Sequence, residues 1–253
     1  ENIDSSRTFF LNFGLIARKI PRIPVSLDPE QLKYFQEKNP GFNPGHWSLD
    51  DLCRLSLLLA LDTADNKDYI STLLAASDMR EQVIIYRSLP YLPNPEEFIL
   101  LAVDGIRTNM VDVFDSIALD NNFPFRHFSE DAWNQMVLKA IFMERPVYRI
   151  YGLDDRRNQT LADILHDFVH ERWSAKRPVT PELWRLVRGH IRPEIFEDLK
   201  KVTREGNELE TQAAIKALQE SEYEPASQWL SDNDLPETSL SWEEIGKRTI
   251  EGK

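Results

Sequence analysis

The chain has 253 residues with 42 acidic and 30 basic side chains, so its formal net charge is −12 and its pI is about 5.0. A nucleic-acid surface needs clustered Lys and Arg, and here the basic residues are interspersed with acids, so we expect no nucleic-acid partner. No apolar run approaches the ~20 residues that span a bilayer, and a single cysteine excludes an intramolecular disulfide. These features predict a soluble, cytoplasmic protein without a transmembrane segment.

Helix signals run through the whole chain, and strand signals are nearly absent. There are only 9 glycines and no sustained alternation of apolar and polar residues. The apolar spacing is helical, and we expect about a dozen helices over roughly 65% of the chain, against a base rate near a third. The predicted fold class is therefore all-α.

Residues 1–27 are expected to form an N-terminal amphipathic helix followed by a Pro-rich linker. The stretch "TFFLNFGLIARKI" has helical apolar spacing, is interrupted by Asn12 and lacks the small-residue cleavage site of a targeting segment. The linker is marked by Pro21, Pro24 and Pro29.

Five stretches carry the signals of a helix start. Each has a capping side chain ahead of the first turn and an acid within that turn, and three have Pro at the first helical position. The last one, "SWEE", forms a full capping box. The five capping residues are Asp28, Ser48, Asn94, Thr180 and Ser241.

Three segments, residues 84–101, 136–153 and 213–230, share one layout. Each has an apolar helical half, a short polar turn near a proline and a second apolar half. This layout predicts stacked helix pairs of a HEAT-like α-solenoid, although the irregular spacing leaves an irregular multi-helix array open. We expect one helical-repeat domain over residues 28–230, followed by a polar tail, 231–253, with one short, loosely packed helix.

The stretch "GIRTNMVDVFDSIALDNNFP", residues 105–124, mixes polar residues with helix-core spacing. A continuous helix would contain Gly105 at a cost of ~1 kcal/mol, so a junction between two helices is favoured. We expect Thr108 or Asn109 to cap the second helix. Arg107 falls on the apolar side of the pattern, so another helix is expected to supply a partner for its guanidinium.

The stretch "HDFVHE" places His166 and His170 four residues apart, the spacing of the zinc-binding H-E-x-x-H helix, with Asp167 in place of its Glu. At ~100° per residue, both histidines lie opposite the apolar arc, beside acids. The pattern favours two pairs on a solvated face, Asp163–His166 and Asp167–His170, and no metal. A metal-dependent hydrolase that uses this helix stays open as the alternative.

Other catalytic patterns are weaker. An HD phosphohydrolase needs a further His and Asp around the His166-Asp167 dyad, and His127 and Asp198 are two of several residues available. The stretch "DDRRN", residues 154–158, has the composition of a magnesium site, but a loop followed by a helix cap explains it better. There is no Gly-rich phosphate loop, G-x-S-x-G elbow or Cys/His cluster. We therefore expect no catalytic residue, metal or cofactor, although an enzymatic role is left open.

The middle third of the chain, from Arg107 to about Arg185, contains a long and unusual pattern. It begins with "RTN", continues with "VFDSIA", an Asn followed by an aromatic and Pro, and "NQMVLKAIF", and extends through "RIYGLDDRRNQTLADILHDFVHERWSAKRPVTPELWR". This pattern resembles the EboA family. Asn122 departs from it, because we expect the family to favour Pro at that place in the turn.

The resemblance implies a role rather than a reaction. EboA-like proteins are encoded in a bacterial gene cluster beside a UbiA-type prenyltransferase and TIM-barrel proteins, and the cluster is associated with moving a secondary-metabolite precursor, including that of scytonemin, out of the cytoplasm. We therefore expect a non-enzymatic accessory protein that binds a small aromatic or prenylated metabolite or proteins of the same gene cluster. A pure protein-interaction scaffold is a further alternative. The residues that face the ligand or partner are expected to be those of the matching motif: Arg107, Asn109, Asn121, Asn134, Gln135 and Lys139.

Overall fold

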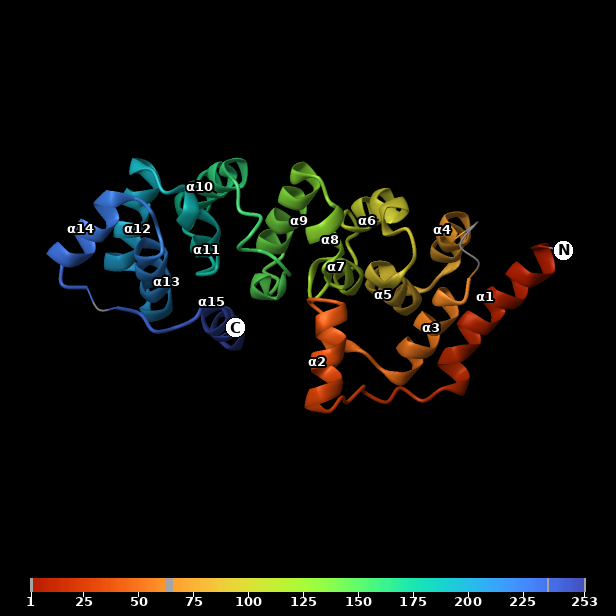
Figure 1. The fold of residues 1–253 in the computed structure, drawn as a ribbon. Helices are drawn as coiled ribbons and strands as arrows, with labels where there is room; N and C mark the ends of the chain where they lie inside the picture. Colours follow the sequence, from red (N-terminus) through yellow and green to blue (C-terminus); the bar gives the residue numbers. More distant parts are fainter. Residues whose placement is uncertain (1, 62–65, 236, 253) are drawn as a thin grey trace. The chain divides into compact units, whose positions relative to one another are not determined.

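The computed structural model of the chain describes residues 2–61, 66–235 and 237–252 (Figure 1). About 70% of the chain is helical, and the described residues contain no strand beyond an isolated bridge between Pro24 and Ser48. The all-α prediction is confirmed, and the HEAT-like stacking of helix pairs stays a prediction. None of the described helices combines the length and the apolar character that a membrane span requires.

The chain divides into two compact units, Glu1–Trp133 and Asn134–Lys253. The first unit is built around α5, which packs against α7, while α1 packs against α3 and α3 against α5. Its core includes Phe13, Ile84 and Phe114, all fully buried. Its helices are α1 (Asn2–Lys19), α2 (Pro29–Lys38), α3 (Leu49–Leu59), α4 (Asn66–Ala76), α5 (Met79–Ser88), α6 (Ile99–Gly105), α7 (Val111–Ala118) and α8 (Phe123–His127), with 3-10 turns η1 (Pro44–His46), η2 (Leu89–Tyr91) and η3 (Pro95–Phe98).

The second unit is built around α13, which packs against α11, α12, α14 and α15. Leu165, Leu186 and Leu199 are fully buried in its core. Its helices are α9 (Glu130–Phe142, whose first turn belongs to the first unit), α10 (Gln159–Ser174), α11 (Leu183–Val187), α12 (Pro193–Glu205), α13 (Glu208–Gln219), α14 (Glu224–Asp232) and α15 (Trp242–Glu251), with 3-10 turns η4 (Val147–Arg149) and η5 (Arg188–His190). The single domain expected over residues 28–230 stays a prediction.

Three of the five predicted helix starts are confirmed. Asp28, Ser48 and Ser241 stand at the N-caps of α2, α3 and α15, each with a reciprocal contact to the residue three positions on. Asn94 has a left-handed backbone, makes no capping bond and precedes a 3-10 turn. Thr180 does not cap a helix, because α11 begins at Leu183, after a turn closed by the Leu183 N–H and the Thr180 carbonyl.

The predicted junction within residues 105–124 is present, because α6 ends at Gly105 and α7 begins at Val111. Asn109 is not a cap: Met110 holds the N-cap position, and the Thr108 hydroxyl accepts a hydrogen bond from the Met110 N–H at 3.1 Å. Of the two capping residues that the sequence suggested, Thr108 rather than Asn109 therefore accepts a hydrogen bond at the start of α7.

The expectation that another helix supplies a partner for the Arg107 guanidinium was wrong. Its side chain is 67% exposed and pairs with Asp104 of the preceding helix at 3.1 Å, not with another helix. The physical reason is that α6 ends at Gly105, so the helical periodicity that placed Arg107 on an apolar face no longer applies at that residue.

The C-terminal helix α15 is also better packed than expected. Trp242, Ile245 and Gly246 are buried, and α15 contacts both η4 and α13. These three positions recur at the three- and four-residue spacing of one helix face, so a short polar segment still presents a continuous buried stripe.

Candidate functional site

The three predicted site residues of the first unit do not share one surface. Arg107 and Asn109 are exposed, whereas Asn121 is buried. The Asn121 amide donates to the carbonyls of Ser116 and Tyr86 at 2.9 and 3.4 Å, and its oxygen accepts from the Phe123 N–H at 2.9 Å. Asn121 therefore stabilises the turn between α7 and α8 and connects it to α5. The ligand- or partner-facing role of Arg107 and Asn109 stays a prediction.

The three predicted residues of the second unit lie on α9 in different environments. Asn134 is buried and exchanges two hydrogen bonds with Asn158, at 3.1 and 2.8 Å, while Asn158 also caps α10. Gln135 is exposed and Lys139 is half-buried. Burial lowers the pKa of Lys139 below its ordinary value. Asn134 thus ties α9 to the start of α10, and the ligand-facing role of all three stays a prediction.

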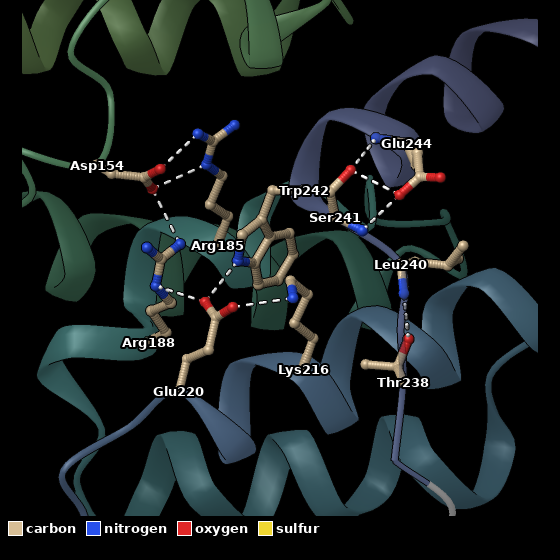
Figure 2. A network of polar contacts seen from close by, with 10 residues as sticks. All are labelled: Asp154, Arg185, Arg188, Lys216, Glu220, Thr238, Leu240, Ser241, Trp242 and Glu244. Carbon is tan, nitrogen blue, oxygen red and sulfur yellow. Dashed lines mark hydrogen bonds and ion pairs between the residues drawn. The ribbon is translucent and has the colours of Figure 1, made fainter.

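A polar network connects five segments of the second unit (Figure 2). Arg185 holds Asp154 through two bonds, at 2.8 and 2.5 Å, and Arg188 bridges Asp154 to Glu220 at 2.9 and 3.0 Å. Glu220 also accepts from the Trp242 indole at 2.8 Å. The network joins the loop before α10 to α11, η5, the C-terminal end of α13 and α15.

The electrostatics of this network explain the "DDRRN" stretch without a metal. Burial raises the pKa of Asp154, but the hydrogen bond from Arg185 and the charges of Arg185, Arg188 and Arg157 outweigh it, so the pKa lies below its ordinary value. The acid at the start of that stretch is therefore neutralised by arginines of the protein itself. Its last residue, Asn158, caps α10 as the loop interpretation expects.

A pocket of about 320 Å³ opens in the same unit, lined by the end of α9, by α10 and by residues of α13 and α15. Its aromatic wall is formed by Phe142 and Phe168, whose ring centroids lie 4.7 Å apart at 36°. Phe142 is 54% exposed, so its ring lies open to solvent at the edge of this pocket. Arg172 and Arg248 add positive charge to the lining, which also contains Glu144 and Glu210.

The histidines of the "HDFVHE" stretch contact α12. His166 Nε2 lies 3.2 Å and His170 Nε2 lies 2.9 Å from the same carboxylate oxygen, Oδ2 of the buried Asp198. The predicted pairs with Asp163 and Asp167 on a solvated face were therefore wrong, because α12 covers part of the face of α10 that was expected to be exposed. Burial raises the pKa of Asp198, and the opposing charges of the two histidines do not restore its ordinary value.

Among the described residues, these arrangements contain no complete set of nucleophile, base and oxyanion donors. A comparison with protein families decides which family the chain belongs to. The model of the family described as "Metabolite traffic protein EboA" matches residues 1–188. The chain belongs to the EboA family. A comparison with curated proteins finds no match, and a comparison with solved structures finds none either.

In this EboA-family protein, sequence reasoning named Asp198 only as one of several residues available around the His166-Asp167 dyad, and it missed the pocket. Asp198 lies on the apolar face of α12, between the buried Ile195 and Val202, so an acid at an apolar helical position was the available signal. The pocket had no comparable local signal, because its lining residues come from segments that are distant in sequence.

Proposed function

We propose that this protein serves metabolite traffic by binding a small metabolite that carries an aromatic or prenyl group in the pocket beside Phe142. The observation that carries this proposal is the half-exposed Phe142 ring, which packs at 36° against Phe168 in the wall of a cavity of about 320 Å³. A cavity of about 300 Å³ or more with apolar walls and a few polar groups is typical of small-molecule sites. An apolar ligand would cover the ring and remove its apolar surface from water.

The charged residues of the pocket lining indicate which metabolites would bind most tightly. The Arg172 guanidinium lies 5.9 Å from the centroid of the Phe168 ring, and its Nε donates to the Pro178 carbonyl at 3.0 Å. Arg248 of α15 lines the same pocket. Two guanidinium groups beside an aromatic wall favour a ligand with a carboxylate, phosphate or phenolate next to its apolar part.

We infer that the protein binds this metabolite without converting it and acts as an accessory protein in the cytoplasm. This inference is supported by the family description, by the match over residues 1–188 and by a pocket whose charged residues include no nucleophile paired with a base.

The test is a thermal-shift screen of the full chain with aromatic and prenylated carboxylates and phosphates, followed by calorimetry of each compound that raises Tm. A ligand that binds only the native state must raise Tm. Phe142→Ala should weaken binding at least about fivefold, because aromatic contacts contribute ~1 kcal/mol beyond area burial. Ile164→Ala is the matched control, since Ile164 is a 39% exposed apolar residue of α10 outside the lining. Unchanged affinity after Phe142→Ala, or a screen without any Tm shift, contradicts the proposal.

A further inference from the structure

Two histidines of α10 and one aspartate of α12 face one another in the second unit. His166, His170 and Asp198 each offer one ligand atom, and the three atoms lie within 4.8 Å of one another. We propose that these three side chains bind a divalent transition-metal ion of the Zn²⁺ type. The site would be separate from the Phe142 pocket, and it does not depend on the function proposed for that pocket.

The distances fit one metal ion. Tetrahedral zinc, with bonds of about 2.0–2.2 Å to nitrogen and oxygen, places neighbouring ligand atoms ~3.3 Å apart. The contacts to Asp198 Oδ2 are 3.2 Å from His166 Nε2 and 2.9 Å from His170 Nε2, close to that separation. The i,i+4 spacing on α10 supplies the histidine pair, with ring centroids 4.7 Å apart. The carboxylate from α12 supplies the third ligand.

His166 provides the second observation that points to a ligand. Its side chain is 15% exposed, and neither of its buried ring nitrogens has a hydrogen-bond partner. Nε2 is within ion-pair distance of Asp198, but the angle does not make a hydrogen bond. Buried polar atoms are normally paired, so an unpaired imidazole is an exception that needs a cause. A metal ion would take the Nε2 lone pair.

The surroundings of the cluster are those of a metal site with an open position. Nδ1 of His166 lies 3.7 Å from the exposed carboxylate of Asp167, which a small rotation would bring into the outer-shell contact that metal-bound histidines commonly make. His170 is 54% exposed, so solvent reaches the cluster. Three protein ligands plus one position open to water or to a ligand oxygen distinguish catalytic-type sites from closed structural ones.

Two features oppose metal binding or compete with it. Lys201, whose ammonium lies 4.3 Å from the centroid of the Trp173 ring, adds positive charge near Asp198. A plain His–Asp ion pair is the competing explanation, and it satisfies His170, whose Nε2 hydrogen-bonds to Asp198 at 2.9 Å. It leaves His166 buried without a hydrogen bond, whereas one shared metal ion accounts for both histidines.

The pocket and the cluster are distinct sites on one helix. Phe168 and Arg172 line the pocket, and each follows a histidine of the cluster by two residues. Two residues correspond to ~200° around a helix, so the two sets point to opposite sides of α10.

The experiment titrates the full chain, stripped of metal, with Zn²⁺ alone by calorimetry and with Co²⁺ alone by visible absorption. We expect stoichiometric zinc binding, a zinc-dependent rise in Tm, and the d–d bands of four-coordinate cobalt. His166→Ala and Asp198→Asn should each weaken zinc binding by at least about 100-fold, because even outer-shell changes cost about 10–100-fold. The matched control is His46→Ala, since His46 also meets a carboxylate, Asp120 at 3.3 Å, but without a second histidine.

The outcomes separate a metal site from a structural ion pair. Circular dichroism in metal-free buffer identifies any variant that fails to fold, and Asp198→Asn keeps the shape of the side chain. The proposal is overturned if the native chain binds no zinc, if the double variant His166→Ala/His170→Ala binds zinc as tightly as the native chain, or if only His46→Ala reduces binding. Because metal ions are the only ligands added, a negative result here says nothing about the metabolite pocket.

Discussion

Asn134 and Asn158 exchange two hydrogen bonds, so each amide oxygen and each amide nitrogen of the pair has a partner inside the protein. Asn158 has a second task, because its oxygen also accepts the Leu161 N–H at the start of α10. Asn134, a residue of the family-matching motif, therefore ties two helices of the second unit together, and the ligand-facing role expected for it stays a prediction.

Asn134→Ala should lower the free energy of unfolding by about 1–3 kcal/mol, because it removes both hydrogen bonds between the buried Asn134 and the half-buried Asn158. Gln135→Ala is the matched control, as the next residue along the same helix is exposed, and its effect should stay within about 0.5 kcal/mol. Urea unfolding of both variants, followed by circular dichroism, measures the difference. Equal stability of the two variants would show that the asparagine pair does not stabilise the fold.

Gly105 shows how one position separates two helices of the first unit. A Cβ atom there would lie 2.6 Å from Ile117 Cδ1 and 2.7 Å from the Tyr86 ring. The close approach of α6 to α5 and α7 therefore requires the absence of a side chain. Immediately after Gly105 the chain leaves the helix, which places Arg107 and Asn109 at the surface.

Gly105→Ala and Gly14→Ala should change stability in opposite directions. Both glycines lie in helices, where alanine is intrinsically favoured by ~1 kcal/mol. A Cβ at Gly14 meets only Glu81 Oε1 at 3.5 Å, an ordinary contact, so Gly14→Ala should raise Tm. At Gly105 the clash with Ile117 and Tyr86 should outweigh this gain and destabilise by roughly 1–3 kcal/mol. Thermal unfolding checks both signs, and a stabilising Gly105→Ala would disprove the close packing of α6.

At the scale of the whole molecule, each compact unit has its own buried core, and the match to the EboA family covers residues 1–188. The first unit therefore lies within the matched part together with α9, α10 and α11. The remaining helices supply Asp198, Glu220 and Trp242, which complete the polar clusters of the second unit.

The acidic composition predicts how the protein behaves with pH. With a formal net charge of −12 at pH 7 and a pI of about 5.0, self-repulsion keeps the molecules apart near neutrality and vanishes near pH 5.0. We expect a solubility minimum close to that pH and recovery at pH 7. Light scattering across the pH range at low ionic strength measures it, and a flat profile would contradict this prediction.

The sequence by itself determined the all-α class, three helix N-caps, the junction at Gly105 and the family. These features are encoded within a few residues of one another, through helical periodicity and local capping bonds. The sequence also identified the two histidines on α10 as a candidate pair, although it assigned them the wrong partners.

Only the tertiary structure decided which side chains meet across helices. His170 and Asp198 are 28 residues apart in sequence, and their contact depends on the packing of α10 and α12. The aromatic pocket and the burial of α15 have the same origin, because both depend on segments that meet only after folding. A periodic pattern shows which face of a helix is apolar. Packing alone determines whether a neighbouring helix covers the polar face. Here α12 brings Asp198 to the two histidines of α10, and the three side chains form a candidate metal site.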